Sequence, residues 1–216
     1  MTSTAAETVP VPDTHPDQIG LGFAEVIALM SLAPGDAAET TAAALGLAEH
    51  RGNPLVVSAG ASSLVAHGYA SATPDDEIEV TGPLAAIALA LGTTERILEL
   101  SLLTPDSVDR IWFVEAADIA ILLQERAALT WWAMAQRADL PRAEAIAFVI
   151  RKHLGQHPQS GVSLARHGDP SGRRLLVKGG EAPWTIGFYR PGLEEVEESP
   201  ADDPALLAAI TDIRGA

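Results

Sequence analysis

The sequence contains no cysteine. This absence excludes disulfides, thiolate zinc sites and cysteine nucleophiles, and it favours a cytoplasmic location. Long apolar runs are also missing: the longest, such as residues 84–91, fall well short of the roughly 20 residues that cross a bilayer. The start, MTSTAAETVPVPDTHPDQ, has no basic segment followed by an apolar one, so we expect neither a signal peptide nor a transit peptide. Residues 1–18 are predicted to be a disordered polar lead.

Basic residues are scarce. Lysine and arginine total 14 against 29 aspartates and glutamates, which gives a formal net charge of -15. Phosphate binding needs a surface rich in lysine and arginine and the counterion release that such a surface drives, so the composition argues against a nucleic-acid partner. The same charge suits a protein that imitates DNA and occupies the basic groove of a target. An acidic inhibitor is therefore one of the functions that the sequence allows.

The chain is long enough and apolar enough to bury a core. It has 216 residues, of which 47% are hydrophobic. This predicts an α+β fold in which an antiparallel sheet carries helices packed on one face. The predicted parts are the lead 1–18, a single domain 19–190, and an acidic linker with a terminal helix over 191–216. Within the domain, 19–92 forms a mainly helical unit and 93–190 forms the sheet with a helix.

The helical unit is predicted from its apolar spacing and its turn residues. Apolar residues recur at three- and four-residue steps, as in amphipathic helices, and prolines and glycines interrupt them. The predicted order is a helix over 19–33, a second helix that ends near Gly52, a short strand over 55–57, a helix over 62–70 capped by Ser62, an exposed polar hairpin over 73–79 and a helix over 84–91.

The second part of the domain is rich in β-branched and aromatic residues separated by short turns. Because parallel neighbours would need long crossovers, this arrangement predicts antiparallel strands. The predicted strands are 97–103, 108–115, 118–125 and 129–135, then 162–167, 173–178 and 183–189 after a helix over 142–154; a capped helix over 202–213 closes the chain.

Three patterns that suggest chemistry each lack a required member. The lone Gly20-Leu-Gly22 follows no predicted strand and has no third glycine, so it does not predict a dinucleotide loop. The serine-rich run 57–63 lacks the second glycine of a nucleophile elbow. The consecutive acids 75–77 cannot all converge on one cation and suit an exposed turn. We therefore expect no cofactor.

Histidines are the remaining catalytic candidates. His153 and His157 are four residues apart, which would place them on one helical face, and His167 follows later. Gly155 and Pro158 predict that the helix is ending there, which favours imidazoles beside the C-terminal helix dipole over a metal site. A hydrolase that uses one of these histidines as its base is kept as an alternative.

The tryptophans indicate a different role. Trp112, Trp131, Trp132 and Trp184 all fall in predicted strands. Because neighbouring strand residues point to opposite faces, Trp131 and Trp132 should do so, with one ring near the surface. Exposed aromatic groups on a sheet typically anchor a protein partner, although core packing is the alternative for each ring. The predicted partner-binding patch comprises Phe113, Trp131 and Trp132.

A family resemblance covers residues 62–189. It rests on the segments LVAHGYA, EIEVTGPLAAIALALGTTERILELSL, ADIAILLQERAALTWWAMAQRADLPRAEAIAFVIRKHL and WTIGFY. In their order and in their general residue character, these segments resemble the EspG family of type VII (ESX) secretion chaperones. The chain departs from that family in leaving little room for its extended helical region between the two sets of strands. The resemblance implies a cytoplasmic, non-catalytic adaptor that binds a helical secretion substrate through an apolar surface. It transfers no ligand residue to this chain.

Three other functions stay open beside the chaperone hypothesis. An acidic inhibitor or DNA mimic should lose its target as salt rises, whereas an apolar contact should weaken little. A histidine-dependent hydrolase should show a bound metal or an enclosed pocket. A structural protein should form large assemblies.

Overall fold

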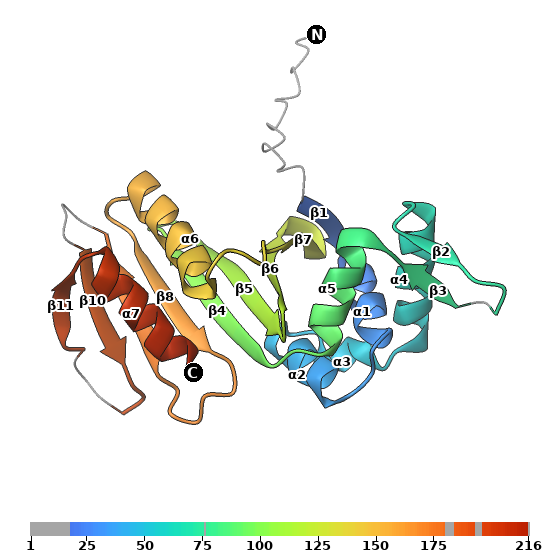
Figure 1. Ribbon diagram of the computed structural model, residues 1–216, viewed down its shortest axis with the longest axis horizontal. Helices are drawn as coiled ribbons and strands as arrows, with labels where there is room; N and C mark the ends of the chain where they lie inside the picture. Colours follow the sequence, from blue (N-terminus) through green and yellow to red (C-terminus); the bar gives the residue numbers. More distant parts are fainter. Residues whose placement is uncertain (1–17, 76, 180–183, 193–195, 216) are drawn as a thin grey trace, which may run out of the picture.

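A computed structural model describes residues 18–75, 77–179, 184–192 and 196–215. The predicted lead up to residue 17, Asp76, residues 180–183, residues 193–195 of the predicted linker and residue 216 lie outside the described residues. The described chain has the predicted α+β class, with a nine-stranded antiparallel sheet and a separate two-stranded sheet (Figure 1). Among the described residues, no helix is both long and apolar enough to span a bilayer.

The large sheet consists of two antiparallel meanders joined side by side. The first runs from β4 to β7 and the second from β8 to β11; β4 pairs with β8, and β1 extends the sheet beyond β7. In sheet order the strands are β1 (Gln18–Gly22), β7 (Thr130–Ala135), β6 (Ile119–Arg126), β5 (Val108–Ala116), β4 (Arg96–Leu103), β8 (Gly161–Arg166), β9 (Arg174–Lys178), β10 (Trp184–Tyr189) and β11 (Glu198–Ala201).

The remaining elements are the helices and a small hairpin. The hairpin, β2 (Ala70–Ala72) and β3 (Ile78–Val80), forms the second sheet at the predicted polar turn. The helices are α1 (Phe23–Ser31), α2 (Asp36–Ala44), α3 (Ala48–Arg51), α4 (Pro54–Ala66), α5 (Gly82–Gly92), α6 (Arg142–Gln156) and α7 (Asp203–Arg214), with a short 3₁₀ helix (Ala127–Leu129) between β6 and β7. The predicted strands from residue 97 onward and the helices α6 and α7 are confirmed.

Two hydrophobic cores lie on opposite faces of the large sheet. Successive residues of a strand point to opposite faces, and in β5 Trp112 and Val114 enter the first core whereas Phe113 enters the second. Helices α1 and α5 close the first core, where α5 lies directly over β5 to β7; α6 and α7 close the second core, where α7 lies directly over β8 and β9. Each half of the sheet is thus covered by helices on one face, and the covered face changes between the halves.

The N-terminal helix begins later than its apolar spacing predicts. Residues 18–22 form the edge strand β1, in which Ile19 lies opposite Ala133 and Leu21 opposite Trp131 of β7. Alternation of Ile19 and Leu21 with glycines fits an edge strand as well as it fits a helix, and glycine disfavours the helix. The prediction of one helix over 19–33 is therefore wrong for its first turn.

Helix α4 replaces the predicted short strand and later helix. Its N-terminus is capped by the Asn53 side chain, which accepts a hydrogen bond of 3.0 Å from the Leu55 N–H, and Pro54 occupies the first turn. The predicted cap Ser62 lies inside the helix. Gly60 faces α1 so closely that a Cβ atom there would lie 1.9 Å from the carbonyl oxygen of Ala24.

The C-terminal segment is an integral part of the second core. The predicted linker contains the edge strand β11, where Pro200 is tolerated because an edge needs fewer ladder hydrogen bonds. Asp202 caps α7 by accepting a hydrogen bond of 3.0 Å from the Ala205 N–H. Leu206 and Ile210 of this helix are fully buried.

The close approach of α1 and α4 gives a first testable prediction. Gly60→Val places side-chain atoms where the Ala24 carbonyl lies, so the helices must separate and the free energy of unfolding should fall by about 1–3 kcal/mol. Urea denaturation followed by circular dichroism measures the change. Gly155→Ala in α6, where a new Cβ meets nothing within 4 Å, is the matched control and should leave stability unchanged or slightly higher. Equal stability of Gly60→Val and the wild type would contradict the packing.

Candidate functional site

The structure does not bring the three predicted partner-binding residues together. Phe113 is 2% exposed in the second core and Trp131 is 3% exposed in the first, where its ring centroid lies 5.2 Å from that of Trp112. Trp132 is half-buried on the opposite face from Trp131, under the guanidinium of Arg126 at 4.2 Å. The prediction that the two adjacent rings face opposite ways is confirmed. The prediction that Phe113 and Trp131 are exposed is wrong, because helices cover the face of the sheet on which each side chain lies.

His153 takes part in a structural contact at the end of α6. Its Nε2 atom lies 3.1 Å from the carbonyl oxygen of Leu103 and 3.1 Å from Oγ of Ser160. A carbonyl oxygen only accepts, so Nε2 must carry the proton, and the Ser160 hydroxyl donates to the His157 carbonyl at 2.6 Å. In this arrangement Nε2 has no lone pair to take a proton from Ser160. The contact holds α6 against the end of β4, and Ser160 and His153 are not arranged as a nucleophile and its base.

The other two histidines do not complete a site with His153. The ring centroid of His157 lies 5.1 Å from that of His153. His167 is exposed after β8, and its backbone N–H donates a hydrogen bond of 2.9 Å to the Ile97 carbonyl oxygen. Within the described ranges, no group of three histidine, aspartate or glutamate side chains is placed to hold a metal ion. The residues of Gly20-Leu-Gly22 lie in β1, and the serine-rich run lies within α4.

Glu25 is a buried carboxylate that the sequence analysis missed. It is 3% exposed and accepts hydrogen bonds from the Gly22 N–H at 2.7 Å and from Ser63 Oγ at 2.7 Å, while one of its oxygens lies 2.9 Å from His67 Nδ1. Ser63 and His67 both turn toward Glu25, so His67 is not placed as a base for Ser63. These contacts join β1, α1 and α4.

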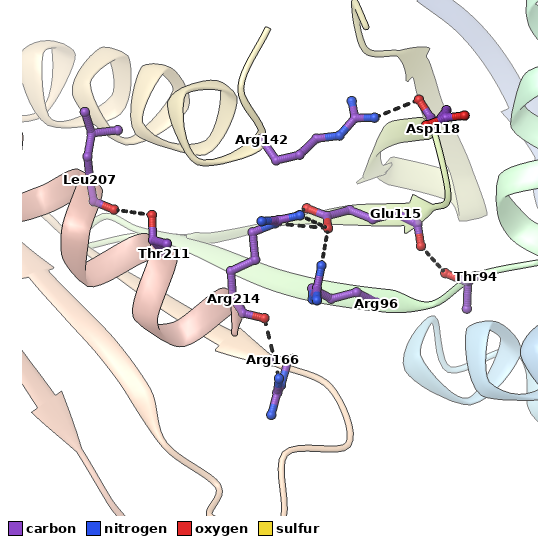
Figure 2. A network of polar contacts seen from close by, with 9 residues as sticks. All are labelled: Thr94, Arg96, Glu115, Asp118, Arg142, Arg166, Leu207, Thr211 and Arg214. Atoms are coloured by element: carbon purple, nitrogen blue, oxygen red, sulfur yellow. Dashed lines mark hydrogen bonds and ion pairs between the residues drawn. The ribbon is translucent and has the colours of Figure 1, made fainter. Parts of the chain in front are cut away.

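Glu115, near the C-terminal end of β5, forms a second buried ionic contact (Figure 2). It is 6% exposed; Arg96 donates to it at 2.9 Å, and Arg214 at the end of α7 donates to both of its oxygens at 2.9 Å. Hydrogen bonding to Glu115 raises the pKa of Arg214. Neither residue's role was predictable from sequence, since they are 99 positions apart.

A cavity of about 330 Å³ adjoins this ionic contact, with Thr94, Arg96, Arg166 and His167 in its lining. The two arginines in this lining make structural contacts: Arg96 donates to Glu115, and Arg166 Nη1 lies 3.5 Å from the carbonyl oxygen of Arg214. This cavity therefore belongs to the region in which the end of α7 contacts the sheet.

The best candidate for a functional site is a groove between α4 and the β2–β3 hairpin. Helix α4 and the hairpin lie at the opposite end of the molecule from α7 (Figure 1). The groove has a volume of about 440 Å³. The lining comprises Ser58, Ala61, Ser62, Val65 and Ala66 from α4 with Ala72, Glu77 and Ile78 from the hairpin. We call these eight residues the α4 groove. Its apolar and small side chains suit contact with a protein segment rather than catalysis.

Helix α4 is unusual for a surface helix because none of its 13 residues is charged. Gly60 and Leu64 are buried toward α1, yet the opposite side exposes Leu55 at 80% and Val65 at 37%. A helix on the surface of a soluble protein normally carries charged residues on its outer face. An uncharged outer face that borders an apolar groove is typical of a surface that binds another protein.

No protein-family model matches the sequence, and a search of curated proteins gives no match. The resemblance to the EspG family therefore stays a prediction from the order of residues.

The Glu115 contact gives a second prediction. Glu115→Ala leaves the guanidiniums of Arg96 and Arg214 without this carboxylate, and the free energy of unfolding should fall by about 2–3 kcal/mol, which is below the range for fully buried pairs because both arginines keep some solvent contact. Urea titration measures the loss. Asp109→Ala, at the exposed start of the same strand, is the control and should change stability by less than about 0.5 kcal/mol. A similar effect of both substitutions would exclude a structural role for the contact.

Proposed function

We propose that this protein is a non-catalytic adaptor of the chaperone type, which binds a helical segment of a partner protein in the cytoplasm. The observation that carries the proposal is the uncharged, exposed face of α4 beside the apolar α4 groove. The arrangement of His153 and Ser160 supports it indirectly, because the one close serine–histidine pair among the described contacts is used to hold the fold. The resemblance to EspG adds a specific partner class, a type VII secretion substrate.

Identification of the partner and of its dependence on this protein tests the proposal. The tagged protein is used to capture partners from its native lysate at low salt and at about 1 M salt, where the Debye length is about 3 Å. The captured protein is then expressed with and without this chain. We expect a helical partner that stays bound at high salt and whose soluble fraction rises several-fold on co-expression, because its apolar segment is covered.

The control for this experiment is co-expression with an unrelated acidic protein of similar net charge. If both acidic proteins raise the solubility of the partner equally, or if neither raises it, the adaptor proposal is wrong. Recovery of a DNA-binding protein that high salt removes would instead support the acidic inhibitor.

A further inference from the structure

Negative charge is concentrated in the first part of the chain. Residues 1–95 contain twelve aspartates and glutamates but one basic residue, Arg51, whereas residues 96–216 contain thirteen basic residues and seventeen acidic ones. Arg51 is already engaged, since its Nη1 lies 3.4 Å from a carboxylate oxygen of Glu39 and its side chain is 18% exposed. Among the described residues of this part, 18–75 and 77–95, eight are acidic and Arg51 is the one lysine or arginine.

The same imbalance holds at the α4 groove. Glu77 lines the groove, and Asp75 and Glu79 are exposed on the same hairpin. The other wall, α4, contributes no charge. An uncharged wall of small and apolar residues opposite the carboxylate of Glu77 is complementary to a segment that has an apolar stripe and basic residues beside it.

The shape of the groove favours a helix as the occupant. On α4 the outward residues Leu55, Ser58, Ser62 and Val65 follow helical spacing, so they form one stripe along a helix about 20 Å long. Small residues in the middle of this stripe let another helix approach closely, and the larger Leu55 and Val65 stand toward its ends. An extended peptide would need a free strand edge, and β2 and β3 are each only three residues long.

We infer that the α4 groove binds the apolar face of a cationic amphipathic helix supplied by a partner protein. This inference rests on the proposed adaptor function and adds the binding site and the chemistry of the partner. The apolar stripe supplies most of the affinity through burial, and lysine or arginine residues beside it select the partner by pairing with Glu77 and through attraction to the other acidic residues of the helical unit.

A matched pair of synthetic peptides tests the inference. Both are about 18 residues long, enough for a helix of about 27 Å, and share one leucine and alanine stripe; the flanking positions are lysine in one peptide and glutamate in the other. Fluorescence anisotropy measures the binding of each labelled peptide to the purified protein. We expect the lysine peptide to bind at least about tenfold more tightly, and about 1 M salt to reduce this difference by screening.

Two groove variants and one distant variant locate the binding site. Val65→Asp places a charge in the apolar contact and should lower the affinity for the lysine peptide by about tenfold or more. Glu77→Lys should lower the affinity for the lysine peptide and raise the affinity for the glutamate peptide. Phe148→Asp removes a side chain that is 61% exposed on α6 and should change either affinity by less than about twofold. Urea midpoints of the three variants verify that each is folded.

Equal affinity for the two peptides, no binding of the lysine peptide, or unchanged binding by Val65→Asp would each overturn the inference. A larger loss in Phe148→Asp than in the groove variants would also overturn it, by placing the contact on α6. These outcomes are separate from failure of the proposed function: a partner that this chain keeps soluble even when Val65→Asp is present supports the adaptor and excludes the groove as its binding site.

Discussion

The structure depends on the central strands β4 and β5, which carry apolar side chains on both faces. Ile97 and Val114 lie opposite each other in the first core, and the adjacent residues Leu98 and Phe113 lie opposite each other in the second. A shift of one residue in this pairing would turn each set toward the wrong core. Two cores that are filled from alternate positions of the same strands therefore fix the register of the whole sheet.

This double use of the central strands explains how one continuous sheet serves two groups of helices. The strands from β5 toward β1 need cover on one face, which α1 and α5 provide, and the strands from β4 toward β11 need cover on the other, which α6 and α7 provide. Glu115 is the residue before the last one of β5, near the boundary between these regions. Its contacts with Arg96 and Arg214 connect a central strand to the last helix, so the C-terminal segment completes the second core.

The sequence predicted the strands well because local signals define them. Short turns separate runs of β-branched and aromatic residues, and both signals act within about ten residues. It did not predict which aromatic side chains are exposed, since a strand that is apolar on both faces gives no alternation from which the covered face can be inferred. Phe113 and Trp131 illustrate this point: each lies beneath helices from a distant part of the chain.

Local pattern was also insufficient where tertiary contacts decide the conformation. The run Leu55-Val56-Val57 favours a strand by composition, yet the Asn53 cap and the packing of Gly60 on Ala24 place it in α4. In β1, two apolar residues spaced by glycines fit strand and helix alike, and pairing with β7 selects the strand. The prediction missed α4 and the groove beside it, because it divided this helix into a strand and a later helix.

The two sides of helix α4 contribute unequally to the stability of the fold. Gly60 and Leu64 hold it against α1, and the Glu25 contact to Ser63 fixes it from the same side. Leu55 and Val65 are exposed on the opposite side and belong to neither core. Since burial of apolar area stabilises only the residues that lose solvent contact, exposed apolar residues on that side add little to folding. The requirements of the fold therefore do not account for their lack of charge, and this is the observation on which the adaptor proposal depends.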